Sequence, residues 1–318
     1  PHEIRDPLTD LVRPDPARAR AAVGELTKRG AAAVPGVMPL LEHQDPDVRV
    51  RALAVLEGVK ARQAVDRISP RLADDDARVR AAATKALGRI GEPRAIPAVV
   101  GALADREEVV RINAITALGL LNATTAVPQL RTIAPRRDRS DAERQAAILA
   151  LGHLGAREAA DDLLRILQDQ SEREKTRGAA VVALGGIRDP RAVGESVRLA
   201  RDRSRVIRFH AVSALGTLGG AEAERELVRV LRDRTEENFL RVRAAAALGS
   251  LRTPGGTQAL LDVAKDPQET EFIRMHAAQV LVTLGAPGGK EAALELRRSA
   301  RDPFVTGTLD RLLREGPR

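Results

Sequence analysis

The sequence predicts an all-α protein: a right-handed α-solenoid of about nine helix-pair repeats, closed by a C-terminal capping helix. Three observations lead to this prediction. The phrase VRAAATKALGRIG, which begins at Val79, returns along the chain, for example as IRFHAVSALGTLG from Ile207. Apolar residues within each copy follow the helical period of about 3.6 residues. No useful stretch shows the period of two that indicates a β-strand.

Each repeat is predicted to hold two helices, joined where Pro, Gly and Asp interrupt the pattern. Residues 94–105 and 221–232 are examples of the first helix. The second helix carries a column of leucines at steps of 30 to 33 residues: Leu26, Leu56, Leu87, Leu118, Leu151, Leu184, Leu215, Leu248 and Leu281.

Seven residues before this Leu, every repeat except the first carries an arginine. These are Arg49, Arg80, Arg111, Arg144, Arg177, Arg208, Arg241 and Arg274. Positions in the second helix are numbered from this residue, so that Arg+3 lies three residues after it. Apolar residues at Arg−1, Arg+3, Arg+6, Arg+7 and Arg+10 form one face of the helix.

Two columns of small residues predict that neighbouring repeats approach closely. Arg+3 is Ala in all eight repeats with the arginine, and Arg+8 is Gly in six of them. A helical Gly costs about 1 kcal/mol relative to Ala, so a gain in packing must offset it. One repeat cannot bury its own apolar face, whereas stacked repeats can. We therefore expect a single body over residues 1–318, with repeats over 15–302 and a cap and tail over 303–318.

An acidic column ends the first helices, six or eight residues before the next arginine. An Asp there can accept free backbone N–H groups while an arginine from the adjacent repeat binds its carboxylate. We favour this structural role over a set of catalytic carboxylates. The predicted ladder comprises Asp74, Arg80, Asp105, Arg111, Asp138, Arg144, Asp202 and Arg208.

The two helices per repeat, the Asp at the turn and the pattern V-R-x-x-A-x-x-A-L-G-x-[IL]-G resemble the HEAT-like, armadillo-like repeat family, in particular its short bacterial form named after phycobilisome lyases. The resemblance covers about residues 15–302 and implies the fold. It does not imply one function, because the family includes scaffolds, chromophore lyases, a hydroxylase and DNA glycosylases. The chain departs from the pattern in turns two residues longer before Arg177, Arg241 and Arg274, and in Val282 where Gly is usual. We expect the curvature to change there.

Composition excludes several kinds of site. The chain has no Cys, so it holds no disulfide, thiolate metal site or Cys nucleophile. It also lacks Trp and Tyr, and aromatic residues make up only 1%, so Ala, Leu, Val and Ile must form the core. The longest uncharged run, residues 112–130, contains Asn, Thr, Pro and Gln, and we reject it as a membrane-spanning helix.

The net charge of +8 does not by itself indicate a nucleic-acid-binding protein. Residues 1–100, 101–200 and 201–318 carry net charges of +3, +1 and +4, so no part of the chain forms a basic tail. Arg outnumbers Lys 46 to 6, which is typical of GC-rich coding and raises the isoelectric point without a phosphate-binding surface. A mixed, solvated surface is the better interpretation.

Tests for catalytic and metal motifs find none. A HEAT-like hydroxylase needs several His-Glu pairs, and the sequence has only His2-Glu3. HEAT-like DNA glycosylases have a basic concave surface with Trp and Tyr side chains. This chain has neither of these residues. There is no phosphate-binding G-x-x-x-x-G-K-[ST], no H-E-x-x-H and no G-x-S-x-G motif. We therefore predict no enzyme activity, cofactor or metal, although no short motif decides for or against a lyase.

One candidate interaction surface stands out near the C-terminus. All four Phe residues lie in the last third of the chain, at the starts of second helices, in columns that point away from the core stripe. Second helices line the concave side of a HEAT-like solenoid. The alternative is that these Phe side chains fold over the turn and cap the stack. The predicted contact residues are Phe209, His210, Phe239, Val242, Arg243, Phe272, Met275 and His276.

These observations favour a non-enzymatic scaffold or adaptor that binds a protein segment on its concave face. Binding should be strongest at repeats six to eight, counted from the first that carries the arginine. The alternative is a phycobilin-lyase-like or chaperone-like accessory enzyme acting on a protein-bound cofactor, and nucleic-acid binding ranks third. We expect a monomer with a protein partner and no membrane segment or small-molecule substrate. No signal peptide is visible, which favours the cytoplasm; a leader removed before Pro1 would not be seen in this numbering.

Overall fold

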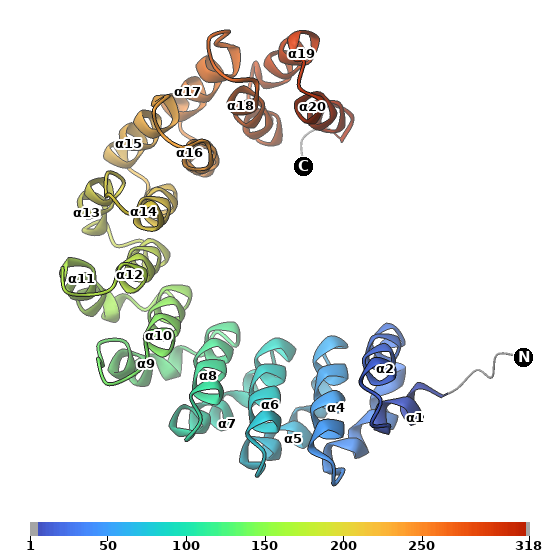
Figure 1. Ribbon diagram of the computed structural model, residues 1–318. Helices are drawn as coiled ribbons and strands as arrows, with labels where there is room; N and C mark the ends of the chain where they lie inside the picture. Colours follow the sequence, from blue (N-terminus) through green and yellow to red (C-terminus); the bar gives the residue numbers. More distant parts are fainter. Residues whose placement is uncertain (1–5, 316–318) are drawn as a thin grey trace, which may run out of the picture. The chain divides into compact units, whose positions relative to one another are not determined.

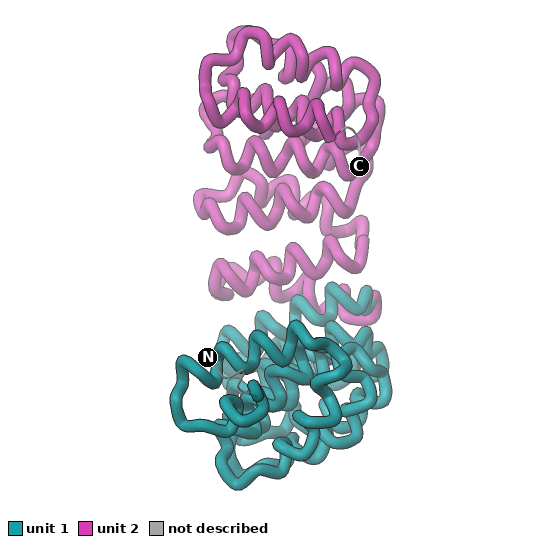
Figure 2. The backbone as a smooth tube through the Cα atoms, turned by 90° about the vertical axis from the view of Figure 1, so that its right-hand side faces the viewer, with its two compact units in different colours: residues 1–156 teal, residues 157–318 magenta. Residues whose placement is uncertain are grey.

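The computed structural model describes residues 6–315, and every regular element in that range is a helix. The prediction of an all-α fold is confirmed. Contacts between Cα atoms divide the chain into two compact units, residues 1–156 and 157–318 (Figure 2). The single body expected over the whole chain stays a prediction. Within the described range no helix is both long and apolar enough to span a bilayer.

The second helices of the repeats form one row in each unit (Figure 1). In unit 1 they are α2 (Pro16–Lys28), α4 (Pro46–Gly58), α6 (Ala77–Ile90), α8 (Glu108–Leu120) and α10 (Asp141–His153). In unit 2 they are α12 (Glu174–Ile187), α14 (Arg205–Leu218), α16 (Asn238–Leu251) and α18 (Glu271–Thr283). Side chains cap the N-termini of many of these helices. Asp45, Ser140 and Thr270, for example, accept backbone N–H groups of the first turn.

The first helices of unit 2 are continuous and form a second row, outside the row of second helices in Figure 1. They are η8 (Arg157–Ala159) with α11 (Ala160–Gln168), α13 (Ala192–Leu199), α15 (Ala221–Arg232) and α17 (Pro254–Lys265). The bounds predicted for 221–232 are confirmed. Leu227, Val230 and Leu231 of α15 are buried, so this helix closes the core from the other side.

The first helices of unit 1 are broken, although one continuous helix was predicted over residues 94–105. Pro39, Pro70 and Pro97 have no N–H to continue an α-helical ladder, so short α and 3₁₀ turns alternate. The pieces are α1 (Pro7–Val12), η1 (Gly30–Ala33), α3 (Val34–Val37), η2 (Met38–Glu42), η3 (Arg62–Ala64), α5 (Val65–Ile68), η4 (Ser69–Ala73), η5 (Pro93–Ala95), α7 (Ile96–Gly101), η6 (Ala102–Ala104), η7 (Thr124–Ala126) and α9 (Val127–Ile133).

The chain ends in a further helix pair, α19 (Gly289–Ser299) and α20 (Pro303–Glu315). Val305 and Leu309 of α20 are fully buried, as expected of a cap. The helix packs on both α18 and α19, so it continues the row of second helices. The predicted capping helix is thus the second helix of this last pair. Residues 316–318 of the predicted tail lie outside the described range.

Glycine at Arg+8 lets successive second helices touch. A Cβ placed on Gly88 would lie 2.6 Å from the Cβ of Ala117, which is at Arg+6 of the next repeat. At Gly216 the same contact, to Ala247, would be 2.7 Å. Both distances are shorter than carbon atoms tolerate, so a larger residue would push the helices apart.

A left-handed residue at Arg+11 ends the second helices. Gly91 takes this conformation with φ of 78°, as Gly commonly does at this point. Four repeats place a residue with a side chain there instead: Lys60, Asn122, Arg188 and Arg252, with φ between 51° and 58°. Such residues are strained in this region of backbone space.

The first two rungs of the acidic ladder have the predicted geometry. Arg49 Nη2 donates to Asp74 Oδ1 at 2.8 Å. Arg80 donates through Nε and Nη2 to the two oxygens of Asp105, at 2.8 and 3.0 Å. The Asp105 carboxylate also accepts the backbone N–H of Glu107 at 2.8 Å. The Arg80 fork, more than any other group, holds the pKa of Asp105 below its usual range.

The third rung differs from the prediction. Arg111 donates to Glu143 Oε2 through Nη2 at 2.9 Å, and Glu143 is fully buried. Asp138 accepts instead from Arg136 in its own turn, at 3.0 Å from Nε. The role predicted for Asp138 is therefore wrong, because Glu143 on the following helix reaches the neighbouring arginine first. Arg144 donates through Nε to the carbonyl of Ala134 at 3.0 Å.

Later rungs are also built on Glu. Arg208 Nη2 donates to Glu236 Oε1 at 3.1 Å. In the register of the first two rungs Asp202 would bind Arg177, which donates through Nε to the carbonyl of Leu167 at 3.1 Å. The Asp202 carboxylate accepts the N–H of Ser204 at 2.8 Å, so its predicted role as a rung is wrong. It caps its turn.

The longer turns explain this change from Asp to Glu. Asp233 and Asp266 stand eight residues before the next arginine, whereas Glu236 and Glu269 stand five before it. Arg241 binds Glu269 through both Nη atoms, with 3.2 Å between Nη1 and Oε1, and Nε donates to the carbonyl of Leu231 at 2.9 Å. Two inserted residues move the Asp away from the stack, and a Glu three residues later supplies the carboxylate.

Candidate functional site

The phenylalanines of unit 2 form two stacked pairs on the row of second helices. Phe209 on α14 and Phe239 on α16 have ring centroids 6.2 Å apart and planes inclined by 30°. Phe272 on α18 and Phe304 on α20 stack in the same way at 6.4 Å. Phe209 and Phe272 are half-buried, whereas Phe239 and Phe304 expose 39% and 61% of their surface. Each pair therefore has one anchored ring and one open to solvent.

Two arginines lie over these rings. The Arg205 guanidinium carbon is 5.2 Å from the centroid of Phe239, and that of Arg243 is 5.3 Å from Phe209. Arg205 also pairs with Glu237. Arg243 Nε donates to Ser213 Oγ at 2.7 Å. The rings and the cations hold one another in place, which lowers the entropy that a ligand would have to remove.

The two histidines are half-buried between successive helices. His210 makes an edge contact with Phe209 and packs closely on Gly178, where a Cβ would lie 2.7 Å from His210 Cδ2. His276 contacts Phe272 edge-on at 4.6 Å. Burial lowers the pKa of His210, and the nearby Arg243 lowers it further. Burial also lowers the pKa of His276, against a hydrogen bond with Gln279. Both rings are therefore neutral at neutral pH, and the positive charge comes from the arginines.

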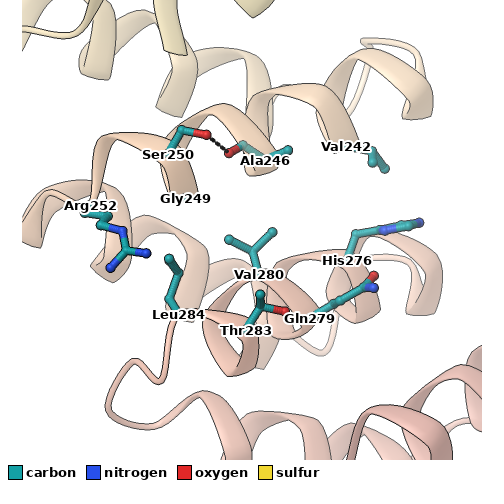
Figure 3. A pocket seen from close by; sticks show the side chains of 10 residues that line it. All are labelled: Val242, Ala246, Gly249, Ser250, Arg252, His276, Gln279, Val280, Thr283 and Leu284. Atoms are coloured by element: carbon teal, nitrogen blue, oxygen red, sulfur yellow. Dashed lines mark hydrogen bonds between the residues drawn. The ribbon is translucent and has the colours of Figure 1, made fainter. Parts of the chain in front are cut away.

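A pocket of about 440 Å³ lies between α16 and α18, next to this surface (Figure 3). Val242 and His276 face each other at one end, and Arg252 and Leu284 lie at the other. Its lining is mostly apolar. The full set is Val242, Ala246, Gly249, Ser250, Arg252, His276, Gln279, Val280, Thr283 and Leu284.

Most of these lining residues were missed from the sequence. One signal was available: Val280 occupies Arg+6, where the two preceding repeats have Ala214 and Ala247. A Cβ on Gly249 would lie 2.5 Å from Val280 Cγ1, so the larger side chain occupies the space that Gly leaves.

Met275 was predicted to line the surface, and this prediction is wrong. The side chain is fully buried. Arg+1 faces the next helix of the row, as the contacts of Gly178 with His210 and of Phe209 with Arg243 show. For Met275 the next helix is α20, which packs against α18. The cap therefore covers Met275 and leaves Phe272 at the edge.

The other seven predicted residues are all half-buried or exposed. Together with Phe304 we name them the Phe surface: Phe209, His210, Phe239, Val242, Arg243, Phe272 and His276. Within residues 6–315 no group of three or more His, Asp or Glu side chains is arranged to hold a metal ion. The pair His2-Glu3, considered above as a hydroxylase motif, lies outside the described residues.

Stacked helix pairs with Arg-carboxylate links between repeats define an α-solenoid repeat protein. A family model described as HEAT repeats matches residues 34–112, 101–176 and 169–239. These segments cover more than half of the chain, and the protein belongs to the HEAT-repeat family. A search of the curated proteins finds no match.

Several solved structures are similar to the chain. The complex of CpcE and CpcF of phycocyanin lyase from Nostoc sp. PCC7120 has 21% identity and a TM-score of 0.51, over 71% of this chain and 92% of that one. Human deoxyhypusine hydroxylase in complex with glycerol has 24% identity and a TM-score of 0.36, over 81% and 96%. An engineered protein has 17% identity and a TM-score of 0.45, over 97% of both chains. The first likeness supports the fold.

Proposed function

We propose that the protein is a non-enzymatic scaffold that binds a segment of a partner protein on the Phe surface. The observation that carries the proposal is the pair of phenylalanine stacks, each with one ring open to solvent, beside an apolar pocket. Large apolar side chains grouped on a surface mark interaction sites. Phe and Arg are also enriched at the centres of interfaces.

The surface favours a partner with a particular chemistry. An aliphatic or aromatic side chain fits the pocket between Val242 and Leu284. Arg243 is exposed, and in the described part of the chain no carboxylate is paired with it. A partner carboxylate beside the pocket would form that pair. The segment we expect therefore combines a large apolar residue with an acidic neighbour.

The alternative interpretation is that the Phe side chains only cap the stack. Phe209 and Phe272 fit that interpretation, because they are half-buried. Phe239 and Phe304 do not, since a ring that serves the core is expected to be covered. Replacing these two residues therefore separates binding from folding.

The test is a selection of displayed peptides on the wild-type protein, followed by affinity measurements with Phe239→Ala/Phe304→Ala. We expect the selected peptides to lose at least tenfold in affinity while the melting temperature changes little. Val109→Ala is the matched control, because Val109 occupies the Arg−2 column of unit 1 and is 54% exposed. Peptides that bind the double variant as tightly as the wild type would refute the proposal.

The likeness to the phycocyanin lyase complex favours a second candidate function, a lyase-like accessory enzyme. It would act on a protein-bound chromophore. Incubation with apo-phycocyanin and a bilin tests it, with chromophore attachment followed by absorbance after denaturation. Attachment above the spontaneous rate would support this candidate, whereas the scaffold proposal predicts none.

A further inference from the structure

Unit 1 has a second hollow, of about 880 Å³, between the C-terminal parts of α4, α6 and α8. Four cations and one carboxylate line it: Lys60, Arg62, Lys85, Arg89 and Glu57. We name it the basic hollow. It lies in the other unit from the Phe surface and shares no residue with it.

Glu57 pairs with both cations that α6 contributes to the hollow. Its Oε1 lies 3.2 Å from Lys85 Nζ and 3.3 Å from Arg89 Nε, and its side chain is 16% exposed. Arg62 pairs with Glu92 at 3.3 Å. One carboxylate cannot neutralise two cations, and Lys60 has no carboxylate partner among the described residues. Positive charge is therefore left over in the hollow.

The ends of α4 and α6 account for single cations but not for the group. A basic residue near a helix C-terminus is stabilised by the helix dipole. The effect of the helix dipole extends over only about one turn, and it does not require the cations to line a shared hollow. Here Lys85 lies a full turn before Arg89, and both are more than half exposed on the same wall. The arrangement indicates a binding site for carboxylates.

The spacing of these cations suits an extended peptide. Residues four apart on a helix are separated by about 6 Å along its axis. In an extended chain, side chains on one side are about 6.6 Å apart, since they are two residues apart. Acidic residues at alternate positions can thus meet Lys85 and Arg89 in turn. Leu120, which is 53% exposed on the same lining, offers an apolar contact for a side chain beyond them.

Nucleic acid fits the hollow less well. Single strands bind where aromatic rings stack on the bases, and the lining of the basic hollow has none. A carboxylate peptide needs no stacking, and its charges at alternate residues are spaced more widely than the phosphates along one nucleic-acid strand.

We propose that the basic hollow binds an extended acidic segment of a partner protein, with Asp or Glu at alternate positions followed by an aliphatic residue. This site is separate from the Phe surface, so either proposal can fail alone.

The probe is a short fluorescent peptide with Glu at alternate positions, Ser between them and a terminal Leu, followed by anisotropy with the full chain. Lys85→Gln and Arg89→Gln should each weaken binding up to about fivefold, and the double variant should lose more. Arg67→Gln is the matched control. Arg67 is an exposed cation of the same unit, paired with Glu42 and not part of the lining, and its loss should leave affinity unchanged.

Three outcomes would overturn the proposal. The first is no binding of the peptide at low salt. The second is equal weakening by Arg67→Gln, which would show that only the net charge matters. The third is tighter binding of a single-stranded oligonucleotide of equal charge, which would assign the hollow to nucleic acid. A peptide with its Glu residues placed in one block is expected to bind more weakly than the alternating one.

Discussion

The buried Arg241–Glu269 pair gives the sharpest test of how the repeats are held together. Only 2% of the Arg241 side chain and 5% of the Glu269 side chain are exposed. In Glu269→Gln the guanidinium stays buried between α16 and the next turn without its counter-charge. We expect a large loss of stability, because the desolvation of Arg241 is no longer offset.

The size of the loss follows from the burial. Removing one partner of a buried ion pair costs about 3–5 kcal/mol. For a domain the size of unit 2, each kcal/mol lowers the melting temperature by about 2–4 °C. Glu269→Gln should therefore lower the melting temperature by about 6–20 °C, measured by circular dichroism or calorimetry.

The control is Asp262→Asn. Asp262 pairs with Arg232 at 2.7 Å on the surface, with both side chains about half exposed, and such pairs contribute about 0.2–1 kcal/mol. If both variants melt within a few degrees of the wild type, the buried rung does not hold the stack. A loss of stability in Glu269→Gln equal to that in Asp262→Asn would refute the reasoning from burial.

Glu269→Gln also gives a prediction for how stability depends on pH. Burial raises the pKa of Glu269, but its hydrogen bonds to Arg241 and to the N–H of Thr270 lower it by more. The group thus stabilises the fold above its unfolded pKa of about 4.3, and the contribution is lost as the pH falls through the folded value. The stability difference between wild type and Glu269→Gln should therefore shrink below about pH 4.

Three further predictions concern single residues. Arg188→Gly should stabilise the protein by about 0.5–1 kcal/mol, because Gly removes the left-handed strain but adds entropy to the unfolded chain; a lower melting temperature would contradict this. Gly216→Val should destabilise by about 1–3 kcal/mol through its clash with Ala247, and unchanged denaturant unfolding would show that the helices are not in contact. Arg243→Gln should raise the pKa of His210, though not to its ordinary value because burial remains; an NMR titration checks this, with Arg205→Gln as the control that should leave it unchanged.

The stacking of the repeats was predictable from the sequence because the same packing requirement recurs along the chain. Gly at Arg+8 sits where successive helices touch, most tightly at Gly88 and Gly216, so a larger residue is penalised in these copies. The first helices were harder to predict. Pro97 lies inside an apolar stretch whose pattern indicates one helix, yet its missing N–H breaks the ladder.

The candidate site was only partly predictable. The columns placed Phe239 and Phe272 on the second helices, but exposure depends on the next helix in the row. Met275 occupies the same column as Phe209, and α20 covers it. Val280 lines the pocket where most repeats have Ala at Arg+6, and such a difference carries little signal until the two helices are seen together.

The ladder shows which features a stack fixes and which it leaves free. Its arginines stay in one column, yet the carboxylate that binds them varies: Asp105 lies in a short turn, Glu143 on the following helix and Glu269 in a longer turn. Stacking therefore specifies the position of a charge rather than the residue that carries it. Columns that face away from the core are under no such constraint. Large apolar or uncompensated charged residues there need a cause outside the stack, which is why the Phe surface and the basic hollow are the places to look for partners.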